Sequence, residues 1–105
     1  MVAHGIELDT EAIRAFCCKW KIRELCVFGS ILRDDFRPDS DVDFLVDYAE
    51  DAEWDLFDHF DMQDELARIV GRDVDIVDRG VIETSRNRLR KREILSTAEP
   101  VVATR

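Results

Sequence analysis

Three short apolar runs constrain this chain most strongly, because each is too short for a helix yet apolar enough for a core. They are ELCVFG (residues 24–29), DVDFLVDY (41–48) and DVDIVD (73–78). Runs of about four to eight residues, rich in Val, Ile and Phe and bounded by Gly, Pro or Asp, are typical of buried β-strands. The chain is therefore predicted to build its core on a sheet of at least three strands.

Helical periodicity marks two longer segments. In the first, residues 9–20, Asp9 or Thr10 is the expected N-cap, and apolar residues recur at i, i+3, i+4 and i+7, namely Ile13, Phe16, Cys17 and Trp20. A second helix is predicted over residues 54–70, with Gly71 as its C-cap. We expect its apolar face to contain Leu56, Phe57, Phe60, Ala67 and Val70. Trp54 and Phe57 are interpreted as core residues, with part of a partner surface as the alternative.

Two further helical segments complete the pattern. Residues 30–36 are long enough for only a turn or two of helix, and the segment after Gly80 is predicted to be helical although its apolar residues make no clean stripe. The resulting order, α-β-α-β-α-β-α, predicts an α+β fold, in which a small mixed sheet is packed with helices. We expect one domain over residues 1–105, with a basic C-terminal segment at 79–105.

Composition excludes several classes of protein. A hydrophobic content of 46% in 105 residues is too high for intrinsic disorder, and no apolar run approaches the roughly 20 residues of a membrane span. The N-terminus lacks the pattern of a signal peptide. The three cysteines are odd in number and lack the spacing of a zinc site, which indicates reduced thiols and predicts a cytoplasmic location without membrane contact.

The charge is unevenly distributed along the chain. Residues 1–78 hold 21 acidic and 8 basic side chains, whereas residues 79–105 hold 3 and 7, giving the overall net charge of −9. A body this acidic repels phosphate backbones, so direct binding to nucleic acid is not expected. The basic run RNRLRKR (86–92) is interpreted first as a solvated helix face, then as a contact for an acidic protein, and last as a contact for nucleic acid.

Two aspartates stand inside the second predicted strand. Residues i and i+2 of a strand point to the same face, so Asp41 and Asp43 are expected to lie side by side, while Val42 and Phe44 point into the core. A divalent cation relieves the repulsion between such carboxylates, and Mg²⁺ prefers one or two carboxylates with water and phosphate oxygens. The alternative is an edge strand or loop whose aspartates only face water.

The residues upstream favour the metal site. Gly29 ends the first predicted strand and Ser30 begins a helical turn, an arrangement that presents backbone N–H groups and a hydroxyl to an anion. Arg33, one turn later, could add a guanidinium to the same phosphates. Together with Asp41 and Asp43, this pattern indicates a site for a nucleoside triphosphate with Mg²⁺.

These motifs resemble a known signature. Gly29-Ser30, ten intervening residues and Asp41-Val42-Asp43 are similar to the signature of the DNA polymerase β-type nucleotidyltransferase superfamily, and FGSILRDDFRPDSDVDFLV (28–46) resembles its minimal nucleotidyltransferase (MNT) branch. The resemblance implies a nucleotidyltransferase fold, with catalytic motifs over residues 25–78. It assigns Gly29, Ser30, Arg33 and Ser40 to nucleotide binding. Leu32-Arg33-Asp34 departs from the usual Ala-Arg-Gly, and Asp34 adds a negative charge near the phosphates.

The superfamily uses a third carboxylate on a neighbouring strand. VDIV (74–77) resembles the corresponding MNT segment and nominates Asp75. Asp73 would share a strand face with Asp75 and is the second choice, and Asp78 is the third. The resemblance implies that Asp41, Asp43 and Asp75 hold two Mg²⁺ ions and that Asp75 accepts the proton of the attacking hydroxyl.

The resemblance also implies a reaction and a partner. Small MNT proteins are similar to the antitoxin of a type VII-like toxin–antitoxin pair, which transfers AMP from ATP to a tyrosine hydroxyl of a HEPN ribonuclease toxin and neutralises it. We expect the acceptor to come from a partner or to be small, because the catalytic motifs occupy the middle of the chain. Two alternatives remain, namely a non-catalytic antitoxin that masks its toxin and an enzyme that modifies a small hydroxylated molecule such as an aminoglycoside.

Overall fold

The computed structural model describes residues 2–3, 6–29 and 41–103 of the chain. Its centre is a four-stranded sheet in the order β5-β4-β3-β6, formed by β3 (Ile22–Phe28), β4 (Val42–Tyr48), β5 (Val74–Asp78) and β6 (Glu99–Ala103). β3 is antiparallel to both β4 and β6, whereas β4 and β5 are parallel. The predicted α+β class with a small mixed sheet is confirmed.

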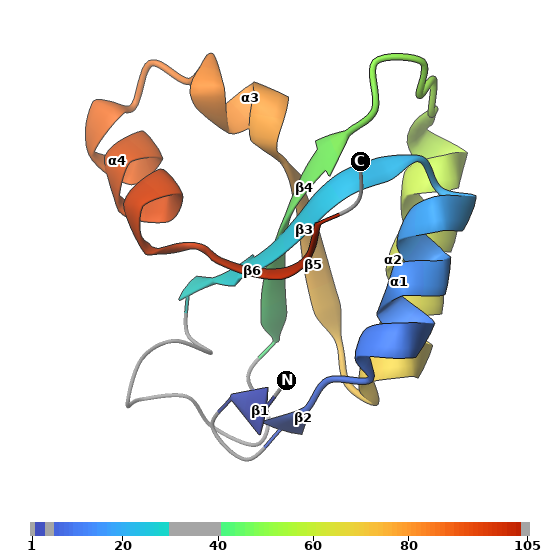
Figure 1. Cartoon of the computed structure of the whole chain (residues 1–105). Helices are drawn as coiled ribbons and strands as arrows, with labels where there is room; N and C mark the ends of the chain where they lie inside the picture. The colour runs from blue at the N-terminus through green and yellow to red at the C-terminus, as the bar shows by residue number, and fades with distance from the viewer. Residues whose placement is uncertain (1, 4–5, 30–40, 104–105) are drawn as a thin grey trace.

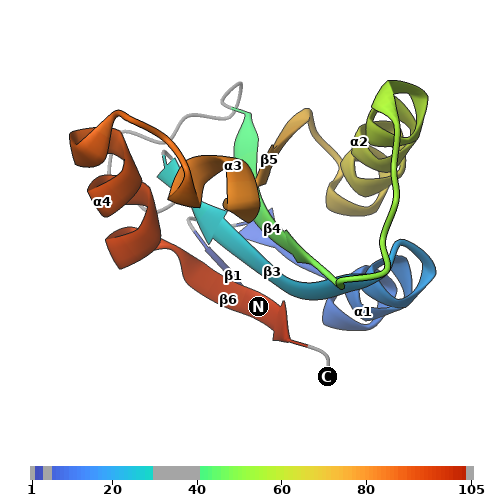
Figure 2. The ribbon, with the colours of Figure 1, turned by 90° about the horizontal axis from the view of Figure 1, so that it is seen from above.

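Helices cover both faces of this sheet. Figure 2 shows α1 (Thr10–Lys19) and α2 (Leu56–Val70) on one side, and α3 (Arg79–Glu83) and α4 (Arg88–Thr97) on the other. Two short antiparallel strands, β1 (Val2–Ala3) and β2 (Ile6–Glu7), precede α1 and form a separate sheet (Figure 1). None of the helices in the described ranges is both long and apolar enough to cross a membrane.

The larger core fills the space between the sheet and the α1/α2 layer. Ile13, Phe16, Cys17 and Trp20 of the first helical segment are buried there, as predicted, and Asp9 caps the helix by accepting a hydrogen bond from Ala12 N at 3.1 Å. From the sheet, Val42, Phe44 and Val46 point into the same core, together with Val74 and Ile76. The predicted inward direction of Val42 and Phe44 is therefore confirmed.

A smaller core lies on the opposite face. It joins the sheet to the α3/α4 layer through Cys26, Phe28, Leu45, Ile82 and Ile94. Because side chains alternate along a strand, the odd-numbered positions of β4 face this layer, including Asp43. The alternation therefore places Val42, Phe44 and Val46 in the larger core, and Leu45 with the two aspartates of β4 on the side of α3 and α4.

The predicted apolar face of α2 is wrong in its first half. Leu56, Phe57 and Phe60 are exposed, and the fully buried residues of the helix are Met62 and Leu66. The buried stripe continues through the half-buried Ile69 and Val70 and lies roughly a quarter to half a turn away from the exposed residues. Gly71 ends the helix in the left-handed conformation, as predicted. Trp54 is half-buried: its ring packs edge-on against Trp20 at 5.2 Å, and its Nε1–H donates to Trp20 O.

The structure adds elements that the sequence pattern did not predict. The C-terminal segment from Arg79 onward contains two helices and then β6, an edge strand paired with β3. Pro100 lies in this strand. Proline has no backbone N–H to donate, and an edge strand tolerates it because such a strand pairs on one side only. The short helix predicted at 30–36 lies outside the described residues.

The two classes of apolar residue in α2 should differ sharply in their effect on stability. Leu66→Ala is expected to lower the free energy of unfolding by about 3 kcal/mol, because it leaves a cavity in the larger core. Phe57→Ala, at a side chain that is 79% exposed, is expected to change it by less than about 0.5 kcal/mol. Urea denaturation followed by circular dichroism measures both. Equal losses would contradict the exposed position of Phe57.

Candidate active site

Asp43 lies at the centre of the candidate site because of the register of its strand. It is opposite Phe28, the last residue of β3, and beside Asp75 of the parallel strand β5. Residues in register on neighbouring parallel strands share a face, and the strands are about 4.8 Å apart. The Asp43 and Asp75 carboxylates are therefore neighbours on the α3/α4 face, where Asp43 is half-buried and Asp75 is exposed.

Asp41 lies one residue before β4 and is exposed. The backbone there is held by the next residue, because Val42 N donates to Asp73 O at 3.0 Å. Asp73 likewise lies just before its strand, so only Asp75 of the three nominated carboxylates is in register with Asp43. Asp78 is at the far end of β5, where its Oδ1 accepts a hydrogen bond from Gly80 N at 2.8 Å and caps α3. This placement favours Asp75, whose role stays a prediction.

Gly29 touches the Asp43 carboxylate. It follows β3 with φ of +76°, a conformation that side chains with a Cβ rarely adopt. A Cβ built on Gly29 would lie 2.5 Å from Oδ2 of Asp43. The glycine is thus required twice, once by its backbone angle and once by the carboxylate beside it. The Asp43 carboxylate fills the space that a side chain at position 29 would need, so the glycine lets this carboxylate pack directly against the backbone at the end of β3.

A cavity of about 750 Å³ opens beside Gly29 and Asp43. Its volume lies in the range of sites that hold a nucleotide-sized ligand. The sheet contributes Phe28, Gly29 and Asp43 to its lining, and α4 with the residues after it contributes Arg90, Glu93, Ile94, Ser96, Thr97 and Glu99. Figure 2 shows α4 on this side of the sheet, away from α1 and α2. The cavity therefore combines an apolar floor with three carboxylates, a guanidinium and two hydroxyls.

The α4 residues were not predicted as part of the site. The basic run was predicted to be a solvated helix face, and Arg86, Arg88 and Arg90 are all exposed, but Arg90 also lines the cavity. Two signals could have identified Arg90. Asn87 is an N-cap whose side chain accepts from Arg90 N at 3.1 Å, which fixes where the helix starts. Ile94 is the buried anchor of the helix, and positions i−4 and i+3 from it, Arg90 and Thr97, share its face.

Three other predicted residues, Ser30, Arg33 and Ser40, lie outside the described residues, and so does Asp34. Their assignment to nucleotide binding stays a prediction.

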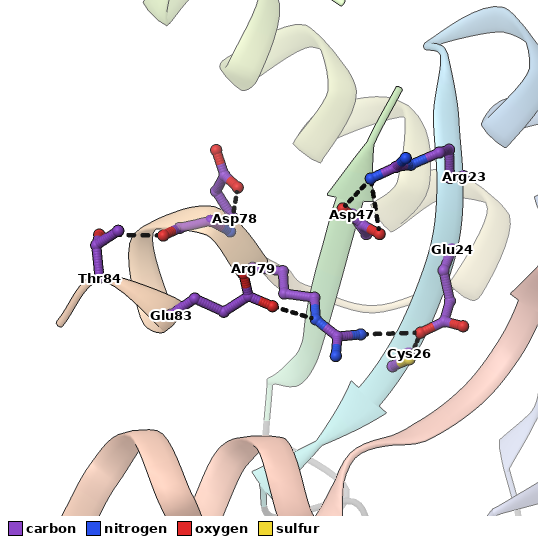
Figure 3. A network of polar contacts seen from close by, with 9 residues as sticks. Arg23, Glu24, Cys26, Asp47, Asp78, Arg79, Glu83 and Thr84 are labelled. Carbon is purple, nitrogen blue, oxygen red and sulfur yellow. Dashed lines mark hydrogen bonds and ion pairs between the residues drawn. The ribbon is translucent and has the colours of Figure 1, made fainter. Parts of the chain in front are cut away.

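A polar network holds α3 against the same face of the sheet (Figure 3). Arg79 donates to Glu24 Oε1 at 3.2 Å and to Glu83 Oε1 at 2.9 Å, and Cys26 Sγ donates to Glu24 Oε1 at 3.3 Å. Burial, followed by the hydrogen bond to Glu24, raises the pKa of Cys26 to about 12. The thiol is therefore protonated near neutral pH and packs rather than reacts.

The donor set fits Mg²⁺, although the described residues do not form a complete metal cage. No group of three or more His, Cys, Asp or Glu side chains within residues 6–29 and 41–103 is close enough to hold an ion alone. Mg²⁺ commonly takes only one or two carboxylates and completes its shell with water and substrate phosphates. Asp43 with Asp75 beside it matches that requirement, and the cavity lined by Gly29 and Asp43 has room for the phosphates.

Comparison with known proteins defines the class. A family model described as a nucleotidyltransferase domain matches residues 10–99. The chain therefore belongs to the nucleotidyltransferase domain family, which confirms the resemblance of the Gly29-Ser30 and Asp41-Val42-Asp43 motifs. Among curated relatives, the protein adenylyltransferase MntA of Thermococcus cleftensis is 37% identical over 59 residues, which cover 56% of this chain and 58% of that protein. The matches span 58–64% of the length of the curated relatives.

Solved structures agree with this family. One assigned to the minimal nucleotidyltransferases is 33% identical, has a TM-score of 0.65 and covers 87% of each chain. Another, a tri-AMPylated HEPN toxin of Shewanella oneidensis in complex with an MNT antitoxin, is 21% identical with a TM-score of 0.61 and covers 92% of this chain and 71% of that one. The second likeness shows the shared fold.

Two glycine variants should separate backbone strain from damage to the site. Gly29 and Gly71 both have positive φ, +76° and +83°, so alanine at either position introduces similar strain, about 1–2 kcal/mol. Only Gly29→Ala also drives a methyl group into the Asp43 carboxylate, because nothing lies within 4 Å of the corresponding position at Gly71. We expect Gly29→Ala to weaken binding of Mg-ATP about tenfold to a hundredfold, and Gly71→Ala to leave it unchanged.

Calorimetric titration of the two variants measures this difference, and denaturation measures the strain that they share. Wild-type affinity for Mg-ATP in Gly29→Ala would contradict the placement of the phosphates at Gly29.

Proposed function

We propose that this chain is a Mg²⁺-dependent protein adenylyltransferase that transfers AMP from ATP to a tyrosine hydroxyl of a HEPN toxin and so acts as its antitoxin. The observation that carries the proposal is the packing of Gly29 on Asp43, in register with Asp75, at the edge of a 750 Å³ cavity. The family supports the class of reaction. The relative named a protein adenylyltransferase and the solved complex of an AMPylated HEPN toxin with an MNT antitoxin support the acceptor.

The residues of the site have distinct roles in this proposal. Asp41, Asp43 and Asp75 would hold the metal, and Mg²⁺ when bound would neutralise triphosphate charge and increase the acidity of the acceptor hydroxyl. Asp75, the more exposed neighbour of Asp43, accepts the hydroxyl proton. The tyrosine oxygen forms a bond to the α-phosphorus of ATP, the bond between this phosphorus and the β-phosphate oxygen breaks, and pyrophosphate leaves.

The lining of the cavity suits the rest of the nucleotide. Phe28 and Ile94 give an apolar surface for part of the nucleoside, and Ser96 and Thr97 offer hydroxyls. Arg90 brings a guanidinium into a site that otherwise carries carboxylates. Ser30, Arg33 and Ser40 are proposed to hold the phosphates with Gly29, as the family signature implies. A cytoplasmic location, where ATP is abundant, is part of the proposal.

The activity is tested by mass spectrometry of a purified HEPN protein from the same genome, beginning with any encoded beside this chain, after incubation with Mg-ATP. We expect the HEPN protein to gain the mass of one or more AMP groups. Asp43→Asn should lower the rate by about a hundredfold or more, because the site loses charge where the transition state requires it. Asp75→Asn should have a similar effect, and Asp73→Asn should not.

Asp47→Asn is the matched control for Asp43→Asn. Asp47 is on the same strand and the same face, but it pairs with Arg23 at 3.2 Å, away from the cavity (Figure 3). A stable complex without any gain in mass, formed equally by wild type and Asp43→Asn, would replace this proposal with neutralisation by masking. Absence of both complex and modification would return small hydroxylated acceptors to consideration.

A second test concerns Arg90. Arg90→Ala should raise the KM for ATP about tenfold or more, because a charge-assisted hydrogen bond to phosphate is lost. Arg88→Ala removes the same charge from the same helix without touching the cavity, and should leave the KM unchanged. Steady-state kinetics at varied ATP gives both values. Equal effects of the two variants would mean that Arg90 acts only through the overall field of the helix.

A further inference from the structure

Three apolar side chains are exposed together at the start of α2. Leu56 is 66% exposed, Phe57 79% and Phe60 54%, and we call these three residues the α2 patch. Two other large apolar side chains in the described ranges are similarly exposed, Val81 on α3 and Leu89 on α4, each without such a neighbour in its own helix. Burying a side chain of this size is worth about 1.5–3 kcal/mol, and clustered apolar side chains at a surface typically mark an interaction site.

A second cavity, of about 210 Å³, adjoins the α2 patch. It is lined by Tyr48, Ala52, Trp54, Asp55, His59, Met62 and Asp78. The two features are contiguous, because the rings of His59 and Phe60 are 6.1 Å apart and Asp55 directly precedes Leu56. The cavity therefore opens at the edge of the patch and could receive a side chain from whatever covers it.

The lining of this second cavity has the chemistry of a site for a cationic side chain. Asp55 and Asp78 supply carboxylates, which are held in place by accepting hydrogen bonds from Asp58 N and Gly80 N. Tyr48 and Trp54 supply aromatic rings, which attract a guanidinium or ammonium group. Burial and then the charge of Asp78 raise the pKa of Tyr48 to about 12, so this hydroxyl adds no charge of its own.

The residues around the α2 patch are mostly acidic, and this charge favours a basic partner. Residues 50–66 contain eight acidic side chains and no Lys or Arg. Two of the eight are paired with lysines, Asp51 with Lys21 and Glu65 with Lys19. Phe57 has Asp61 and Asp64 one and two turns further along its side of the helix. A second copy of this chain, docked through the same patch, would bring like charges together, and nucleic acid would be repelled. A protein with basic side chains around an apolar centre is complementary.

The α2 patch is remote from the catalytic cavity. β4 runs from Asp43, in the catalytic cavity, to Tyr48, in the second cavity, and five residues of strand span about 17 Å. The helix that carries the patch also covers the opposite face of the sheet from α4 (Figures 1 and 2). A protein held at the patch would therefore leave the catalytic cavity open.

We propose that the α2 patch and the second cavity form a docking surface for a protein whose contact face is apolar and ringed by Arg or Lys, one of which occupies the cavity. The inference rests on the proposed function, since it identifies this protein as the one that receives AMP. Docking at a distance from the chemistry raises the local concentration of the acceptor. It should therefore affect the KM for the acceptor rather than kcat.

The test uses the purified HEPN protein of the transfer assay as the probe. Phe57→Ala combined with Phe60→Ala is expected to weaken its Kd about tenfold or more and to raise its KM similarly, with kcat unchanged. Leu89→Ala removes an equally exposed apolar side chain from α4 and should change neither value. Asp61→Lys, at an exposed position beside Phe57, should weaken binding through charge alone, and added salt should weaken binding of the wild type.

Each outcome decides the inference. Wild-type Kd and KM in the double variant would overturn it while leaving the proposed activity intact. Selective loss of binding in the double variant, without AMP transfer by any version, would support the docking surface and contradict the activity. Failure of the wild type to bind the HEPN protein would overturn the docking surface. Self-association of the wild type that the double variant abolishes, seen by sedimentation, would overturn the choice of partner.

Discussion

The contact between Gly29 and the Asp43 carboxylate depends on the register of β4 in the sheet. β4 is the strand that pairs antiparallel with β3 and parallel with β5, so one residue, Asp43, is placed against the end of β3 and beside Asp75 at once. A shift of one residue would turn Asp43 into the larger core and bring Val42 or Phe44 to the candidate site. The buried alternate residues of β4 therefore fix the position of the carboxylates as well as the stability of the sheet.

The two faces of the sheet differ in how much apolar core they carry and in whether they line the cavity. The α1/α2 face contains the larger core, whereas the α3/α4 face combines a smaller core with the candidate catalytic cavity. Polar and ionic contacts such as Arg79 with Glu24 secure the second layer, and contacts of this partly exposed kind contribute only about 0–1 kcal/mol each. The layer that contains Arg90 is thus held by fewer apolar side chains than the layer that stabilises the fold.

Much of this architecture could be predicted from the sequence, because short-range rules determine it. Strand alternation placed Val42 and Phe44 in the core, the 3.6-residue period identified α1, and Gly71 ended α2. Other features depend on tertiary position. Periodicity did not show that α2 buries Met62 and Leu66, since that depends on how the helix lies on the sheet. Pro100 argued against a strand at 99–103, because a proline is tolerated in a strand only at the edge of a sheet, and the edge position is not visible in the sequence. The position of Arg90 in the lining of the cavity was not predicted because it follows from the packing of Ile94.

The position of the nucleotide can be measured directly by NMR, with Mn²⁺-ATP as a paramagnetic probe of backbone amides. We expect broadening centred on Gly29, Asp43, Asp75 and Arg90, while the signals of Tyr48, at the far end of β4, and of Phe57, in α2, stay sharp. Broadening centred on Asp55 and Asp78, or an equal effect at every acidic surface residue, would contradict the assignment of the active site to the Gly29–Asp43 contact.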